Sequence, residues 1–180
     1  MKGYDVVSKA GEKIFIKCKL ETSDILGFSK SGEKINFFLD GTCIGSNVTN
    51  SQGYAQIEYQ FENFSVNQIT MKLDRKSLFL ANTGKIIAGV FDNNKPILIC
   101  DIDHTVCDTK LVLFFFRKDT AVPTVKGSVE SLIRIAKNYN IIYVTHRDEA
   151  IMHRTKKWLE ANCYPQGPVF FWEFGHLPFS

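Results

Sequence analysis

The sequence has 180 residues, of which 44% are hydrophobic and 23% are charged, enough apolar material for one large or two small folded domains. Its net charge of +3 is too small to indicate nucleic-acid binding. No segment approaches the roughly 18 apolar residues of a membrane span, and the N-terminus has no signal-peptide core.

Alternation of apolar and polar residues predicts strands in the first half of the chain. Residues 13–20 (KIFIKCKL) place Ile16, Cys18 and Leu20 on one face and lysines on the other. Further strands are expected at residues 36–39, 54–61, 68–73 and 85–91. Turn signals such as Asp40-Gly41 separate them, so residues 1–91 are predicted to form an all-β sandwich.

The sequence of residues 32–61 resembles a known kind of module. GEKINFFLDGTCIGSNVTNSQGYAQIEYQF resembles the bacterial immunoglobulin-like modules, in which a strand leads into DG, IG and then T…GYA. The resemblance extends over about residues 12–91. It implies an immunoglobulin-like module that binds, spaces or presents something, with no chemistry of its own.

Residues 92–96 (DNNKP) are polar and end in proline, which predicts a linker between two domains. Beyond it the pattern changes to alternating strands and helices, which predicts a parallel α/β domain over residues 97–180. The first strand is fully apolar and is expected to be buried on both faces. The expected elements are a strand at 97–100, a helix from Ser128, a strand at 140–145, a helix at 148–162 and a strand at 168–172.

Asp101 and Asp103 directly follow the first of these strands, and Thr145 ends the second. Ligands of parallel α/β sheets bind beyond the carboxyl ends of the strands. A carboxylate there can attack phosphorus and form an aspartyl-phosphate, while a second carboxylate serves as general acid and base. Asp101 and Asp103 are therefore candidate site residues.

Two motifs in this half resemble a known superfamily. ILICDIDHT resembles the first motif of the haloacid-dehalogenase superfamily, and IIYVTHR resembles its second. Residues 123–172 resemble more narrowly the phosphatidate phosphatases of the lipin, Nir and yeast actin-patch type, through KGSV, YVTHR, TKKWL and PQGP. The resemblance implies a Rossmann-like core in which Asp101 is the nucleophile, Asp103 is the general acid and base, and both hold Mg²⁺. It also implies that Thr145, Arg147 and Thr105 contact the substrate phosphate. An ordinary surface role for Arg147 is an equal alternative.

The sequence departs from this family after the third strand. A lysine and a strand ending in acidic residues are expected there, and neither is visible after Trp172. We therefore expect either a truncated chain or one that borrows strands from a partner or a second copy. In a three-stranded sheet, residues 97–100 would form an exposed apolar edge, which promotes association.

Residues 111–116 (LVLFFF), followed by Arg117 and Lys118, allow two interpretations. One is a flap that enters a membrane surface while the basic residues meet lipid headgroups. The other, which we favour, is a flap packed on the sheet.

Two functions are compatible with these patterns. The first is a Mg²⁺-dependent phosphomonoester hydrolase acting on phosphatidate or another lipid phosphate. The alternative is a non-catalytic protein that binds a phosphate or lipid headgroup. The expected partners are a phosphorylated small molecule or lipid, a membrane surface and a second copy of the chain, but not nucleic acid. Five cysteines without CxxC spacing indicate free thiols in a reducing compartment, so the expected location is cytoplasmic.

Overall fold

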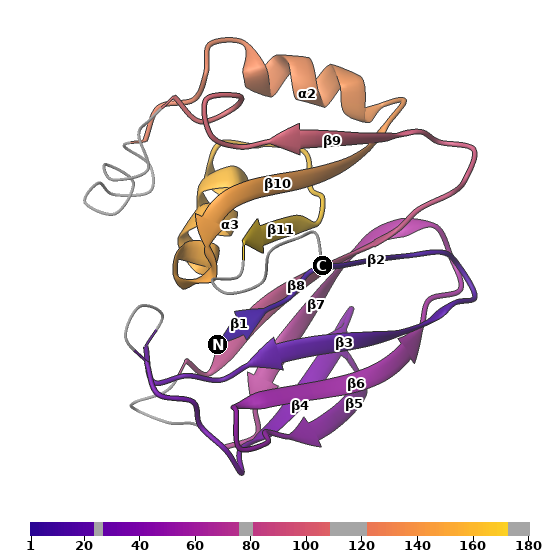
Figure 1. Ribbon diagram of the computed structural model, residues 1–180. Coiled ribbons are helices and arrows are strands. Elements are labelled where there is room, and N and C mark those ends of the chain that lie inside the picture. Colours follow the sequence, from indigo (N-terminus) through magenta and orange to yellow (C-terminus); the bar gives the residue numbers. More distant parts are fainter. Residues whose placement is uncertain (24–26, 76–80, 109–121, 173–180) are drawn as a thin grey trace, which may run out of the picture. The chain divides into compact units, whose positions relative to one another are not determined.

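The computed structural model describes residues 1–23, 27–75, 81–108 and 122–172. The chain divides into two compact units, Met1–Asp92 and Asn93–Ser180 (Figure 1). Strands predominate in the described residues, which contain two α-helices. The flap predicted at residues 111–118, whether packed on the sheet or entering a membrane surface, lies outside the described residues.

The first unit consists of two β-sheets. One sheet has the order β1-β3-β6 and the other has the order β2-β8-β7-β4-β5. Neighbouring strands are antiparallel except β2 and β8, which are parallel. The strands are β1 (Lys2–Gly3), β2 (Val6–Ser8), β3 (Lys13–Lys19), β4 (Lys34–Leu39), β5 (Thr42–Val48), β6 (Tyr54–Gln60), β7 (Ser65–Leu73) and β8 (Thr83–Val90).

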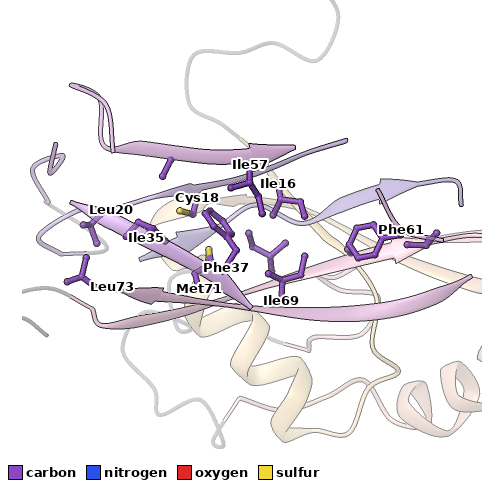
Figure 2. Packing of buried hydrophobic residues seen from close by; sticks show 14 residues of the cluster. Ile16, Cys18, Leu20, Ile35, Phe37, Ile57, Phe61, Ile69, Met71 and Leu73 are labelled. Carbon is purple, nitrogen blue, oxygen red and sulfur yellow. The ribbon is translucent and has the colours of Figure 1, made fainter. Parts of the chain in front are cut away.

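Alternate side chains of both sheets form one buried core, which makes this unit a β-sandwich. Ile16 and Cys18 of β3 are fully buried, as the alternation of residues 13–20 predicts. Figure 2 shows these side chains gathered between the strands with Phe37 of β4 and Met71 of β7. The predicted hairpin turn at Asp40-Gly41 is also confirmed, because both residues have positive φ and connect β4 to β5.

The second unit contains a three-stranded parallel sheet of order β11-β10-β9. A 3₁₀ turn at Glu149–Ile151 precedes its second helix. The elements are β9 (Ile97–Asp101), α2 (Ser128–Ala136), β10 (Asn140–Asp148), α3 (Met152–Ala161) and β11 (Val169–Trp172). Figure 1 shows the three strands side by side, with the two helices in the connections between them.

Both helices pack against the same face of this sheet. Leu132 of α2 and Trp158 of α3 belong to one core cluster with Cys100, Tyr143 and Val169 of the three strands. These strand residues are in alternating positions that share one face. The opposite face carries the exposed residues Ile97, Ile99 and Phe170.

The predicted Rossmann-like haloacid-dehalogenase core is therefore wrong. Such a core has helices on both faces of its parallel sheet, whereas the described chain is predominantly β and its two α-helices cover one face. The prediction that residues 97–100 are buried on both faces fails for the same reason. Ile97 is 49% exposed and Ile99 is 65% exposed, because their side chains lie on the face that the two helices do not cover.

Candidate functional site

The predicted site residues lie at the carboxyl ends of β9 and β10. Asp101 is the last residue of β9 and pairs in register with Val144 of β10. The pairing continues one residue further, because the Ile102 N–H donates to the Val144 carbonyl at 3.1 Å. Asp103 is thereby brought next to the end of β10, which contains Thr145 and Arg147.

Asp103 accepts hydrogen bonds from both of these residues. The Thr145 hydroxyl donates to Asp103 Oδ2 at 2.9 Å. Arg147 Nε donates to Oδ1 at 3.0 Å and to Oδ2 at 3.2 Å, and Nη2 donates to Oδ1 at 2.8 Å. This two-pronged guanidinium–carboxylate geometry is the strong form of an ion pair. Three of the predicted residues are thus in direct contact.

The ion pair is largely removed from water. Arg147 is 0% exposed, whereas the Asp103 side chain is 23% exposed. The other end of the guanidinium is held as well, since Nη1 donates to the Thr155 hydroxyl of α3 at 3.2 Å. Thr155 is fully buried. A buried arginine requires such partners, so Arg147 of β10 is linked to the turn after β9 and to α3.

Asp101 is arranged differently. Strand alternation places it on the face that carries Ile97 and Ile99, and its side chain is exposed. Asp103 instead contacts Thr145, which is buried on the face covered by the helices. The predicted binding of Mg²⁺ by Asp101 and Asp103 stays a prediction.

Thr105 is exposed in the turn that follows β9. This turn is closed by two amides, those of Val106 and Cys107, which donate to the Ile102 carbonyl at 3.0 Å and 2.9 Å. His104 has a φ of 61°, a left-handed conformation that this tight turn imposes on it. The predicted contact of Thr105 with phosphate stays a prediction.

Neighbouring ionisable groups are held in their neutral forms. Burial, and then the negative charge of Asp101, raise the pKa of the Cys100 thiol. Burial also raises the pKa of Tyr143, with smaller contributions from Cys100 and Tyr164. Cys100 is therefore unsuited to act as a thiolate nucleophile beside Asp101.

The sequence did not predict that Thr155 would contact Arg147 at this site. Its position on the inner face of a predicted helix was visible, but a hydroxyl there gives no sign of its partner. The described residues contain no cluster of three or more His, Cys, Asp or Glu that could hold a metal ion. In the same part of the chain, no helix is long and apolar enough to cross a membrane.

No protein-family model and no curated protein matches this chain. Its resemblance to solved structures is weak, as three examples show. The CARDB domain of the PF1109 protein from Pyrococcus furiosus, described in complex with di-metal ions, is 12% identical with a TM-score of 0.34; the match covers 49% of this chain and 86% of that one. A strand-swapped dimer of mouse leukocyte-associated immunoglobulin-like receptor 1 is 10% identical with a TM-score of 0.32, covering 49% and 83%. A cycloisomaltooligosaccharide glucanotransferase from Paenibacillus sp. is 9% identical with a TM-score of 0.37, covering 81% and 27%.

These values are too low to assign a function to the chain. The described residues are predominantly β, and their two α-helices cover one face of a three-stranded sheet, so the predicted membership of the haloacid-dehalogenase superfamily, and of its lipin, Nir and actin-patch branch, is wrong. The hydrolase and phosphatase assignments that depended on that membership lose their basis.

Proposed function

We propose that the end of β10 binds the phosphate group of a phosphorylated small molecule or lipid headgroup, with Thr145 and Arg147 as donors. The observation that supports this is the donor set itself. The Thr145 hydroxyl and the Nε and Nη2 groups of Arg147 converge on two oxygen atoms of one anionic group. Arginine and a hydroxyl in this arrangement are the donors that recognise phosphate oxygens.

Asp103 occupies these donors as an intramolecular competitor. Its two oxygens accept the bonds that phosphate oxygens would accept, and its 23% exposure leaves the pair open to solvent on that side. A phosphomonoester carries up to two negative charges against the single charge of Asp103, so it can compete for the guanidinium. Because Asp103 is held at a high local concentration, we expect the affinity for a free phosphomonoester to be weak.

Asp101 is the residue that would hold the predicted Mg²⁺, since both oxygens of Asp103 already accept hydrogen bonds. Magnesium is commonly held by one or two carboxylates together with water and the oxygens of a phosphate ligand. An exposed carboxylate at a strand end fits that mode of binding. It would supply charge neutralisation at the phosphate.

The test is a titration of ¹⁵N-labelled protein with glycerol 3-phosphate, with and without Mg²⁺, followed by the NMR signals of the Thr145 amide and the Arg147 Nε. We expect saturable shifts, and we expect Asp103→Asn to strengthen binding at least several-fold because the competitor loses its charge. Thr145→Val should weaken binding, while Thr145→Ser, which keeps the hydroxyl, should retain it. Absence of saturable shifts, or no gain in affinity for Asp103→Asn, would refute the proposal.

Lipid headgroups are tested separately, with phosphatidylcholine vesicles that contain or lack phosphatidate. Binding that requires phosphatidate identifies a headgroup ligand, and binding of glycerol 3-phosphate alone identifies a soluble one. The hydrolysis of a phosphomonoester stays a prediction. Release of inorganic phosphate in the same samples, dependent on Mg²⁺ and abolished in Asp101→Asn, would be the evidence for it.

A further inference from the structure

The outer side of β9 has backbone groups that no described strand pairs. Within residues 1–23, 27–75, 81–108 and 122–172, β9 has one partner, β10. The Pro96 carbonyl accepts from Asn140 N–H at 2.8 Å, and Ile102 N–H donates to the Val144 carbonyl. Because backbone direction alternates along a strand, the intervening N–H and C=O groups of Ile97, Ile99 and Asp101 point away from β10.

The side chains along this edge are apolar. Ile97 and Ile99 are 49% and 65% exposed on the face that α2 and α3 leave uncovered. Natural edge strands are protected by lysine, inward-pointing charge or bulges, and β9 contains none of these before its last residue, Asp101. Pro96 limits the edge at its N-terminal end, since proline cannot donate to a further strand. The open edge is therefore short, straight and apolar.

We propose that β9 pairs antiparallel with β9 of a second copy of the chain, which joins the two three-stranded sheets across a twofold axis. Placing Ile99 opposite Ile99 of the second copy sets Ile97 of each chain opposite Asp101 of the other. This register uses all of the outward-pointing residues, and pairs that face each other in this way exchange both N–H···O bonds, up to about six in total. Shifting by two residues in either direction loses one of these pairs.

The charges at the two ends of β9 favour a second copy of β9 over an unrelated strand as its partner. β9 has Lys95 just before its start and Asp101 at its end, with apolar residues between. Antiparallel pairing with itself brings the acidic end of each copy next to the basic end of the other, whereas parallel pairing would place Asp101 against Asp101. The strand is thus complementary to its own inverted copy. Since its contact area is small, the dimer should be weak and concentration-dependent.

Sedimentation equilibrium of the full chain tests this pairing, and it requires neither Mg²⁺ nor phosphate. We expect the average mass to rise from 20.5 kDa towards twice that value as the concentration increases. Ile99→Lys should remain monomeric, because a lysine next to its symmetry mate opposes pairing. The matched control is Phe15→Lys: Phe15 is 60% exposed, but it lies in the first unit, on a strand that pairs with β6 there, so this variant should dimerise like the original chain.

A cross-link gives a positive result that does not depend on loss of association. In the proposed register the two Ile99 Cα atoms are about 5.5 Å apart, within the range of a disulfide. Ile99→Cys in a Cys43→Ser/Cys163→Ser background should form a covalent dimer on mild oxidation, and Phe15→Cys in that background should not. A chain that stays monomeric, dimerisation unaffected by Ile99→Lys, or equal cross-linking of both variants would overturn the proposal. Pairing with another protein instead would leave the purified chain monomeric.

Discussion

The ion pair between Asp103 and Arg147 is unequal in its exposure to water. Arg147 is fully buried, while the Asp103 side chain remains 23% exposed and also accepts from Thr145. Removing Asp103 and removing Arg147 should therefore lower the free energy of unfolding by different amounts. A buried guanidinium without its carboxylate has no water to solvate it, but a partly exposed carboxylate without its arginine can be hydrated.

We therefore expect Asp103→Ala to lower the free energy of unfolding by about 2–3 kcal/mol, below the value for a fully buried pair. Arg147→Met, which keeps most of the volume, should cost only about 1 kcal/mol. Both tryptophans, Trp158 and Trp172, belong to the second unit, so urea unfolding followed by tryptophan fluorescence reports on this unit. A larger loss for Arg147→Met than for Asp103→Ala would contradict this account.

The control for this comparison is the exposed pair of Lys13 and Glu58, in which the side chains are 66% and 50% exposed. Such pairs contribute little, so Lys13→Met should change stability by no more than about 0.5 kcal/mol. At the residue scale, the sequence predicted that Asp103, Thr145 and Arg147 lie together. It did not predict that Thr145 and Arg147 donate their hydrogen bonds to Asp103. Hydrogen-bond partners depend on the directions of the side chains, which the alternation of residues does not determine.

At the scale of elements, the turn between β5 and β6 depends on a glycine. Gly53 has a φ of 80°, and a Cβ there would lie 2.7 Å from the Leu20 carbonyl oxygen. The turn is further held by Asn50, whose side-chain oxygen accepts from the amides of Gln52 and Tyr54 at 3.0 Å each. Gly53 therefore meets two demands: a left-handed backbone and close contact with a neighbouring chain segment.

Gly53→Ala should accordingly destabilise the first unit more than Gly32→Ala does. Gly32 has a φ of 79° but open space around it, so alanine there incurs only the left-handed penalty of about 1 kcal/mol. The contact with backbone at Gly53 adds at least about 1 kcal/mol, because a carbonyl cannot move as a side chain can. Thermal unfolding followed by far-UV circular dichroism measures both. Equal losses would show that the contact with Leu20 does not matter.

Elements with regular alternation were predictable, and others were not. Residues 13–20 and 54–61 correspond closely to β3 and β6. β5 was not predicted. It is an edge strand whose residues are mostly exposed, and the sequence of Thr42–Val48 has no apolar repeat that would indicate a strand. Similarly, Ser128 begins α2 but does not cap it; its hydroxyl donates to the Val125 carbonyl and contacts the Tyr164 hydroxyl.

For the whole molecule, local motifs led to the wrong superfamily. A strand followed by Asp-x-Asp-x-Thr predicts how a chain leaves a sheet, and β9 does end at Asp101. Motifs of this length do not determine how many strands flank that one or which faces the helices cover. Those features depend on contacts between distant segments, such as the packing of both α2 and α3 on one face of the sheet.

Each unit has its own core, and each core contains acidic groups that folding keeps protonated. Burial raises the pKa of the Cys18 thiol in the sandwich from 9.0 to about 12. In the second unit, burial raises the pKa values of Tyr143 and Cys100. Because the folded-state pKa values exceed the unfolded ones, the stabilising contribution is complete below the unfolded pKa and is lost as pH rises towards the folded pKa.

We therefore expect the sandwich to lose stability between about pH 9 and pH 12, by up to about 1.4 kcal/mol per pH unit for one thiol. Cys18→Ala removes the titrating group, so this variant should be less stable at pH 8 but show a flatter decline above pH 9 in urea unfolding followed by circular dichroism. The decline in the second unit, followed by tryptophan fluorescence, should be the same in both proteins, because Cys18 belongs to the other core. An unchanged slope for the sandwich in Cys18→Ala would assign its alkaline instability to other groups.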